Sequence, residues 1–192
     1  MRNTSSSIAN NGMDKPGNEK TKQKLSLHEM TVFAMLASIT FCLKKVMEPL
    51  PNIHPVGMFV MVCALAYRVK GLVPLYTYIV IEGLFYGFSI TWMPYLYSWV
   101  TLWGITMLLP KKMPNGARVV VYPAVCALFG LAYGVFTAPV YAWYFGMPIG
   151  KYIMGGLLYD GYHTAGNLAA GLLVLPVVET LRKADKSLHK HT

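Results

Sequence analysis

Six apolar segments, separated by short polar or basic stretches, restrict the folds that this sequence can adopt. They run over residues 28–47, 54–67, 72–89, 92–109, 119–138 and 150–180. A helix that crosses a bilayer needs about 20 apolar residues, so only the second segment is short, and the sixth is long enough to emerge from the membrane. Only 13% of the residues are charged, against roughly a quarter in soluble domains. The sequence therefore predicts an all-α membrane protein, a compact bundle of six transmembrane helices in a lipid bilayer.

The positions of the basic residues predict the orientation of this bundle. Lys and Arg in short loops stay on the cytoplasmic side of a membrane. When six spans alternate, only Lys44, Lys45 and Lys151 of the 17 basic residues fall on the outer side. Both termini are therefore expected to be cytoplasmic. The expected parts are a disordered basic tail over residues 1–27, the six-helix domain over 28–185 and a cytoplasmic C-terminal tail over 186–192.

The net charge and the cysteines exclude two classes of function. A net charge of +9 could suit nucleic acid, but that needs basic residues gathered on one exposed face, whereas here they form short clusters between apolar runs. Cys42, Cys63 and Cys126 lie within apolar segments and show neither CxxC nor a Cys/His spacing of the zinc type. We expect small core cysteines, no nucleic-acid partner, no metal and no cofactor.

The stretch over residues 81–103 places a carboxylate, Glu82, among apolar and aromatic residues. An ionised side chain at the centre of a spanning helix costs about 2.5–3.5 kcal/mol on insertion scales, so Glu82 needs a partner or a ligand. Glu82, Tyr86 and Ser89 share one face of a predicted helix. Aromatic residues at helical spacing follow on another face, namely Trp92, Tyr95, Trp99 and Trp103. We interpret these faces as walls of a pocket.

A second polar stripe lies in the sixth segment. Asp160, His163 and Asn167 advance by three and four residues, so they fall on one side of a helix. One interpretation is that Asp160 pairs with His163 or Lys44 and only ties helices together. The other is that the stripe lines a ligand site opposite Glu82.

Two outer regions also leave alternatives open. Lys44 and Glu48 at i, i+4 could form an interfacial ion pair, or Lys44 could meet an anionic or carbonyl group of a ligand beneath a loop that acts as a lid. The loop over residues 138–151 contains Trp143 among other aromatic residues, beside Gly146. These aromatic residues suit interfacial anchoring or a gate that stacks on a flat heterocycle.

Small residues four positions apart allow helices to approach closely. Three such pairs occur, namely Ala34 with Ser38, Gly83 with Gly87, and Gly130 with Gly134. We interpret the last two as packing faces inside the bundle. The first pair lies on the helix that follows the N-terminal tail, where it is free to meet a partner subunit.

The sequence resembles the substrate-binding S components of energy-coupling factor (ECF) vitamin transporters over residues 28–185. The local points of similarity are LPNIHPV at 50–56, EGLFYGFSITWMPYLYSW at 82–99 and YDGYHTAGN at 159–167. Ala34 and Ser38 match the position of the family's Ala-xxx-Ala face, with Ser in place of the second Ala. The resemblance implies that this face contacts the transmembrane coupling subunit.

The resemblance also implies a function. Such a protein sits in the plasma membrane of a prokaryote, captures a vitamin-like molecule outside the cell and delivers it with a coupling subunit and two ATPase subunits. The chain has no GxxxxGK[ST] phosphate loop, so it is not expected to be an enzyme and ATP must be hydrolysed by other polypeptides. The residues expected to bind the substrate are Lys44, Glu82, Tyr86, Trp92, Tyr95, Trp99, Trp143, Asp160, His163 and Asn167.

Two other functions stay open at this point. The first is a membrane-embedded enzyme that uses Asp160 and His163 as a base pair or as metal ligands. The second is a self-contained secondary carrier that needs no ATPase. The sequence leaves the identity of the substrate open, because a carboxylate and an aromatic wall suit many heterocycles.

Overall fold

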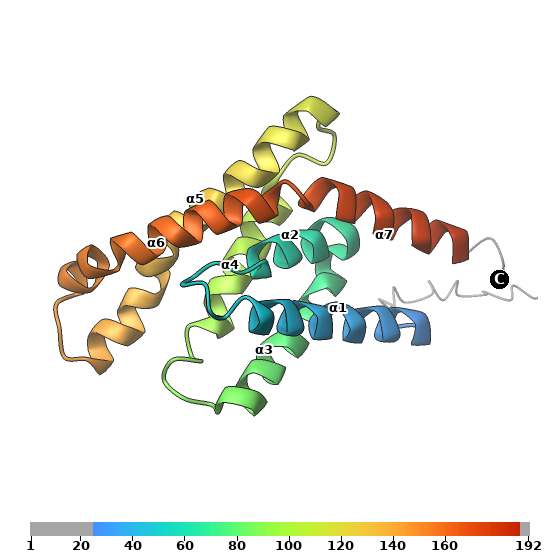
Figure 1. Cartoon of the computed structure of the whole chain (residues 1–192). Helices are drawn as coiled ribbons and strands as arrows, with labels where there is room; N and C mark the ends of the chain where they lie inside the picture. Colours follow the sequence, from blue (N-terminus) through green and yellow to red (C-terminus); the bar gives the residue numbers. More distant parts are fainter. Residues whose placement is uncertain (1–24, 189–192) are drawn as a thin grey trace, which may run out of the picture.

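The computed structural model describes residues 25–188, and over these residues the chain is helical and contains no strand. The described part forms seven α-helices and one short 3-10 helix (Figure 1). Their bounds are α1 Leu27–Val46, α2 Val56–Tyr67, η1 Arg68–Gly71, α3 Leu72–Tyr86, α4 Tyr95–Leu108, α5 Asn115–Tyr144, α6 Ile149–Gly171 and α7 Val174–Leu188. The prediction of an all-α protein is confirmed. The expected terminal tails lie mostly outside the described residues.

Several of these helices are long and apolar enough to cross a membrane. Leu27–Val46, Val56–Tyr86 and Asn115–Tyr144 meet this condition, and α6 with α7, bent by 42° at their junction, form a fourth candidate if they are one span. Large apolar side chains are exposed over most helices, and a soluble monomer rarely exposes such continuous apolar surface. Examples are Met35, Ile39, Leu84, Leu128, Leu131, Met154 and Leu158. The chain is therefore best described as membrane-embedded, with three to four apolar spans in its described part.

The apolar stretch Val56–Tyr86 changes direction at its middle. Arg68 has a φ of 55° and ends α2. In a straight helix, residues eight positions apart lie about 12 Å from each other. Here, a Cβ atom added at Gly71 would instead collide with the carbonyl group of Cys63. The chain therefore turns sharply between α2 and α3. Helix α2, fully buried from Val56 to Ala64, forms the centre of the molecule.

Sequence signals explain where several helices begin and end. Helix α1 begins after Ser26, whose hydroxyl accepts a hydrogen bond from the Glu29 backbone while the Glu29 carboxylate accepts one from the Ser26 backbone, a capping box. Helix α3 ends at Gly87, whose φ of 89° is favourable only for glycine. Because the helix ends there, the prediction that Ser89 shares a helical face with Glu82 is wrong.

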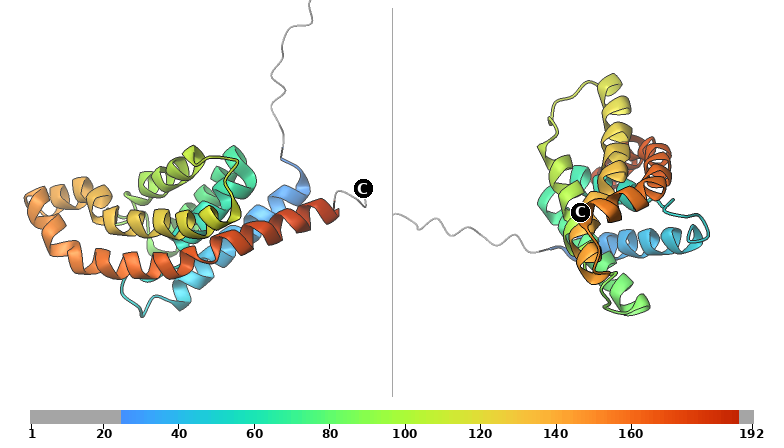
Figure 2. Two further views of the ribbon diagram at one scale, coloured as in Figure 1. Left: turned by 90° about the horizontal axis from the view of Figure 1, so that it is seen from above. Right: turned by 90° about the vertical axis from the view of Figure 1, so that its left-hand side faces the viewer.

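Helices α5 and α6 run side by side along most of their lengths (Figures 1 and 2). Glycines allow this close approach, since a Cβ atom at Gly130 would lie 2.9 Å from the backbone of His163. At Gly134 it would collide with the carboxylate of Asp160. The prediction that Gly130 and Gly134 form an internal packing face is confirmed. For the other pair the prediction fails at Gly87, which lies past the end of α3 with no atom within 4 Å of an added Cβ atom, while Gly83 is buried beneath the loop residues Phe88 and Trp92.

Polar contacts between distant segments gather at the end of the molecule where α1 begins. Lys70 and Glu29 form an ion pair with a distance of 2.5 Å. Arg182 of α7 donates a hydrogen bond to the carbonyl group of Leu65 at 2.8 Å. The loops over residues 47–55 and 87–94 follow the other ends of α1 and α3, and the loop over residues 145–148 joins α5 to α6. The clefts described below lie among these loops.

Candidate functional site

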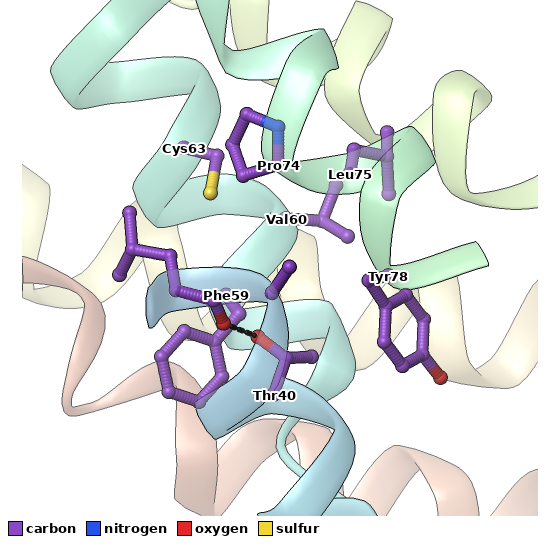
Figure 3. Close-up of a pocket in the computed structure, with 9 residues that line it drawn as sticks. Thr40, Phe59, Val60, Cys63, Pro74, Leu75 and Tyr78 are labelled. Atoms are coloured by element: carbon purple, nitrogen blue, oxygen red, sulfur yellow. Dashed lines mark hydrogen bonds between the residues drawn. The ribbon is translucent and has the colours of Figure 1, made fainter. Parts of the chain in front are cut away.

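A small apolar void lies between α1, α2 and α3 (Figure 3). Thr40 lies in its wall, but its hydroxyl donates to the Leu36 carbonyl of its own helix at 2.7 Å and is not free for a ligand. The void measures about 10 Å³, roughly enough for one water molecule. This void is too small to bind an organic ligand.

A cleft of about 230 Å³ opens between α1, α3 and α4; we call it the Glu82 cleft. It is large enough for a small ring compound. The residues that line it are Lys44, Glu48, Glu82, Tyr86, Gly87, Thr91, Trp92, Tyr95 and Tyr141. Five of these were predicted to bind a substrate, and the structure brings them together.

An ion pair forms the floor of the Glu82 cleft. The ammonium group of Lys44 lies 2.5 Å from Oε2 of Glu82 and 3.3 Å from the hydroxyl oxygen of Tyr95. The side chains of Lys44 and Glu82 are only 19% and 4% exposed. Lys44 therefore offsets the cost of burying the Glu82 carboxylate, and its predicted pairing with Glu48 is wrong.

At the rim of the Glu82 cleft, Lys45 forms the ion pair with Glu48 that was expected for Lys44. Its ammonium group lies 2.5 Å from the Glu48 carboxylate, and both side chains are exposed. Tyr86 joins this pair, since its hydroxyl group donates to Glu48 at 3.1 Å and accepts from Lys45 at 3.0 Å. The hydrogen bond from Lys45 holds the pKa of Glu48 below its ordinary value. Tyr86 is thus held in position at the mouth of the cleft.

The second carboxylate oxygen of Glu82 is buried and has no hydrogen-bond partner among residues 25–188. The hydroxyl group of Tyr78, one turn earlier on α3, is also buried without a partner in this part of the chain. Most buried polar groups in proteins have a partner. Tyr78 lines the small apolar void rather than this cleft, and it lies close enough to Glu82 to interact with its carboxylate. The free capacity at the floor of the cleft is therefore the second oxygen of Glu82.

A larger cleft of about 580 Å³ lies between α4, α5 and α6; we call it the Asp160 cleft. Its lining residues are Asn52, Tyr95, Tyr133, Gly134, Thr137, Tyr141, Met147, Lys151, Tyr152, Gly155, Gly156, Tyr159 and Asp160. Tyr95 and Tyr141 line both clefts. The two carboxylates thus occupy adjacent clefts that share two tyrosine side chains in their walls.

Asp160 is positioned by the close approach of α5 and α6. Its Oδ1 accepts a hydrogen bond from the backbone N–H of Gly134 at 3.1 Å, and the side chain is 4% exposed. Within the described chain neither His163 nor Lys44 hydrogen-bonds or pairs with it. The interpretation that Asp160 pairs with one of these residues is therefore wrong.

His163 and Asn167 lie behind the Asp160 cleft and do not line it. The His163 ring packs against Tyr133 and His54, with ring centroids 4.7 and 4.9 Å away. The Asn167 amide fills the space beside Gly57 and Gly130. Neither side chain makes a hydrogen bond through its ring or amide atoms to another described residue. Their role in substrate binding stays a prediction.

The predicted aromatic wall is divided between different places. Trp92 precedes α4 and lines the Glu82 cleft, while its indole N–H donates to the Ile79 carbonyl at 2.8 Å. Trp99 is 1% exposed and packs in the core. Trp103 donates to the Arg68 carbonyl, and Trp143, 77% exposed, lines neither cleft. The predicted continuous face from Trp92 to Trp103 is therefore wrong.

Sequence reasoning missed Tyr133, Tyr152 and Tyr159, and the expected outer loop over residues 138–151 is wrong, because α5 continues to Tyr144 and α6 begins at Ile149. Tyr133, Thr137 and Tyr141 line the Asp160 cleft and are spaced by four residues, so they share one helical face. Tyr152 and Tyr159 follow on α6. The spacing was a usable signal, but an aromatic residue in an apolar segment is equally typical of a lipid-facing position.

The structure also bears on partners and metals. Ala34 and Ser38 are both exposed on α1, where a second protein can reach them. Over the described residues, no group of three or more His, Cys, Asp and Glu side chains could hold a metal ion. Comparison of the chain with protein-family models, curated proteins and solved structures finds no match.

Proposed function

We propose that this chain is the substrate-specific S component of an ATP-driven micronutrient importer. It captures a vitamin-like heterocycle at the extracellular side and delivers it with a separate coupling subunit and two ATPase subunits. In this proposal the chain spans the plasma membrane of a prokaryote six times, with both termini in the cytoplasm.

The observation that carries the proposal is the Lys44–Glu82 ion pair in the floor of an open cleft. A buried ion pair is costly to form, and this one lies where a ligand can reach it. The ammonium group presents donors and the carboxylate presents acceptors, which suits the polar edge of a heterocycle. Tyr86, Trp92 and Tyr95 line the same cleft and can pack on the faces of a ring.

The exposed face of α1 supports the second half of the proposal. Ala34 and Ser38 are small, exposed residues one helical turn apart. Small side chains let the backbone of a second helix approach closely within a membrane. This face therefore suits contact with a helix of the coupling subunit.

Binding of the substrate can be tested on the purified chain in lipid nanodiscs with a panel of vitamins and their precursors. We expect one compound to bind and Glu82→Gln to weaken it about tenfold or more, because a hydrogen bond to a charged group is lost. Glu179→Gln is the matched control, since Glu179 is exposed on α7. Absence of any binding, or equal affinities of the two variants, contradicts the proposal.

Dependence on the partner subunits is tested by uptake in cells. We expect Ala34→Leu and Ser38→Leu to reduce uptake while the purified variants still bind the substrate, because the added side chains block helix contact. Gly161→Leu, on α6 with no atom within 4 Å of an added Cβ atom, serves as a control away from this face. Sustained accumulation in cells that lack all coupling-subunit and ATPase genes would instead identify a secondary carrier.

A further inference from the structure

The two buried carboxylates of the candidate site differ in their charge balance. Glu82 is neutralised by Lys44 at 2.5 Å. Asp160 is as deeply buried, but within residues 25–188 its carboxylate has no basic side chain in contact and accepts only one backbone hydrogen bond. A buried charge without a partner is strongly unfavourable. The Asp160 carboxylate therefore lacks the positive partner that Glu82 already has.

Aromatic rings line the same cleft as this carboxylate. Five tyrosines line the Asp160 cleft, contributed by α4, α5 and α6, namely Tyr95, Tyr133, Tyr141, Tyr152 and Tyr159. The face of an aromatic ring attracts a cation. A cleft lined by both a carboxylate and tyrosine rings thus favours a positively charged organic group over a neutral or anionic one.

We propose that the Asp160 cleft binds an organic cation with at least one N–H group, such as a protonated amine or an amidinium. The free carboxylate oxygen of Asp160 accepts the N–H, while the tyrosine rings hold the apolar part and stabilise the charge. This inference rests on the proposed function and narrows its substrate class, because the cationic end of the substrate enters this cleft rather than the Glu82 cleft.

Lys151 is the one basic side chain in the lining of this cleft, and it is exposed. Its charge is therefore largely screened by solvent and salt. A weak repulsion of a bound cation remains. We accordingly expect Lys151→Gln to leave the affinity for a cation unchanged or to raise it slightly.

The proposal is tested with benzamidine and its uncharged analogue benzamide, titrated into the full chain in nanodiscs at neutral pH. We expect benzamidine to bind more tightly than benzamide. Asp160→Asn should lower the affinity for benzamidine about 10-fold to 100-fold, because a hydrogen bond to a charged group is lost. Asp185→Asn, at the opposite end of the molecule beside His28, is the matched control.

If Asp160→Asn does not fold, a second variant still tests the proposal. Tyr159 is 53% exposed, so Tyr159→Leu should fold. This variant should lower the affinity for benzamidine about twofold to fivefold, because a cation–π contact is lost, and should leave the affinity for benzamide unchanged. Equal binding of the two probes, or unchanged benzamidine binding in Asp160→Asn, overturns the inference.

The inference and the importer proposal fail in different ways. Micronutrient uptake that depends on the coupling subunit but is unchanged by Asp160→Asn overturns the cation subsite and leaves the importer standing. Benzamidine binding that requires Asp160, in a chain that supports no uptake with any coupling module, overturns the importer and leaves the subsite standing.

Discussion

Lys44 on α1 and Glu82 on α3, 38 residues apart in the sequence, form an ion pair with a distance of 2.5 Å. This contact joins the first and third helices at the end of the bundle that opens into the Glu82 cleft. The cleft therefore depends on a pair of charges that also holds two helices together.

Replacing one residue of this ion pair should destabilise the protein. Lys44→Met leaves the Glu82 carboxylate buried without its cation, and we expect a loss of about 3–5 kcal/mol in the free energy of unfolding. Thermal unfolding in detergent measures it. The double variant Lys44→Met with Glu82→Leu should recover much of the loss, because no buried charge is left.

Lys45→Met is the matched control for this experiment. Lys45 is the next residue, and its ion pair with Glu48 is exposed, so the expected change is below about 1 kcal/mol. Equal destabilisation by Lys44→Met and Lys45→Met would contradict the structural distinction between the two lysines.

The choice between these lysines shows where sequence reasoning reached its limit. Lys44 and Glu48 are four residues apart and Lys45 and Glu48 three apart, and both spacings suit an ion pair on a helix. The rotation of α1 against α3 decides between them, and it depends on core residues such as Leu36 and Phe33. Spacing within one helix carries no information about a partner on another helix.

Helix positions were more predictable than helix ends. The six apolar segments coincide with helices of the structure because burial and lipid exposure both require apolar side chains. The break between α6 and α7 was not predicted from the sequence. The end of α3 at Gly87 was not predicted either, since Gly83 and Gly87 also fit a packing motif. Whether a glycine ends a helix or packs against a neighbour depends on tertiary contacts.

The candidate site was partly predictable for a similar reason. Glu82 and Asp160 attract attention as charges in apolar segments, and both line clefts in the structure. Their separation into two clefts depends on Tyr95 and Tyr141, which belong to different helices. No local pattern in the sequence specifies that arrangement.

The packing of α5 against α6 gives a second prediction. Gly130→Ala would place a methyl group 2.9 Å from the His163 backbone, which forces the helices apart and should cost about 1–3 kcal/mol. Gly161→Ala on α6 meets no atom within 4 Å and should be neutral or slightly stabilising, since alanine favours helix. Melting temperatures of the two variants measure the difference. A stable Gly130→Ala variant would contradict the close packing.

The cysteines give a third prediction, for chemical reactivity. Cys63 and Cys126 are buried, whereas Cys42 is exposed on α1. In detergent we expect a small maleimide to modify one cysteine per chain until the protein is unfolded, after which all three react. Mass spectrometry identifies the modified residue. The variant Cys42→Ser should remove the reaction of the folded protein, and persistent labelling of that variant would show that a buried position is accessible.

The membrane orientation gives a fourth prediction. Leu50, in the loop between α1 and α2, and Lys112, in the loop between α4 and α5, are both exposed. They should lie on opposite sides of the membrane, since the proposed six spans place Lys112 with most of the basic residues inside the cell. In intact cells, a membrane-impermeant maleimide should modify Leu50→Cys but not Lys112→Cys, which should react only after permeabilisation.

The unsubstituted chain controls for the native cysteines in this experiment. Cys42 lies on a predicted membrane-spanning helix and the other two native cysteines are buried, so an impermeant reagent should modify none of them in intact cells. Labelling of Lys112→Cys but not Leu50→Cys would invert the proposed orientation and place both clefts on the cytoplasmic side. Capture of an extracellular substrate by either cleft would then be ruled out, because the loops around them would face the cell interior.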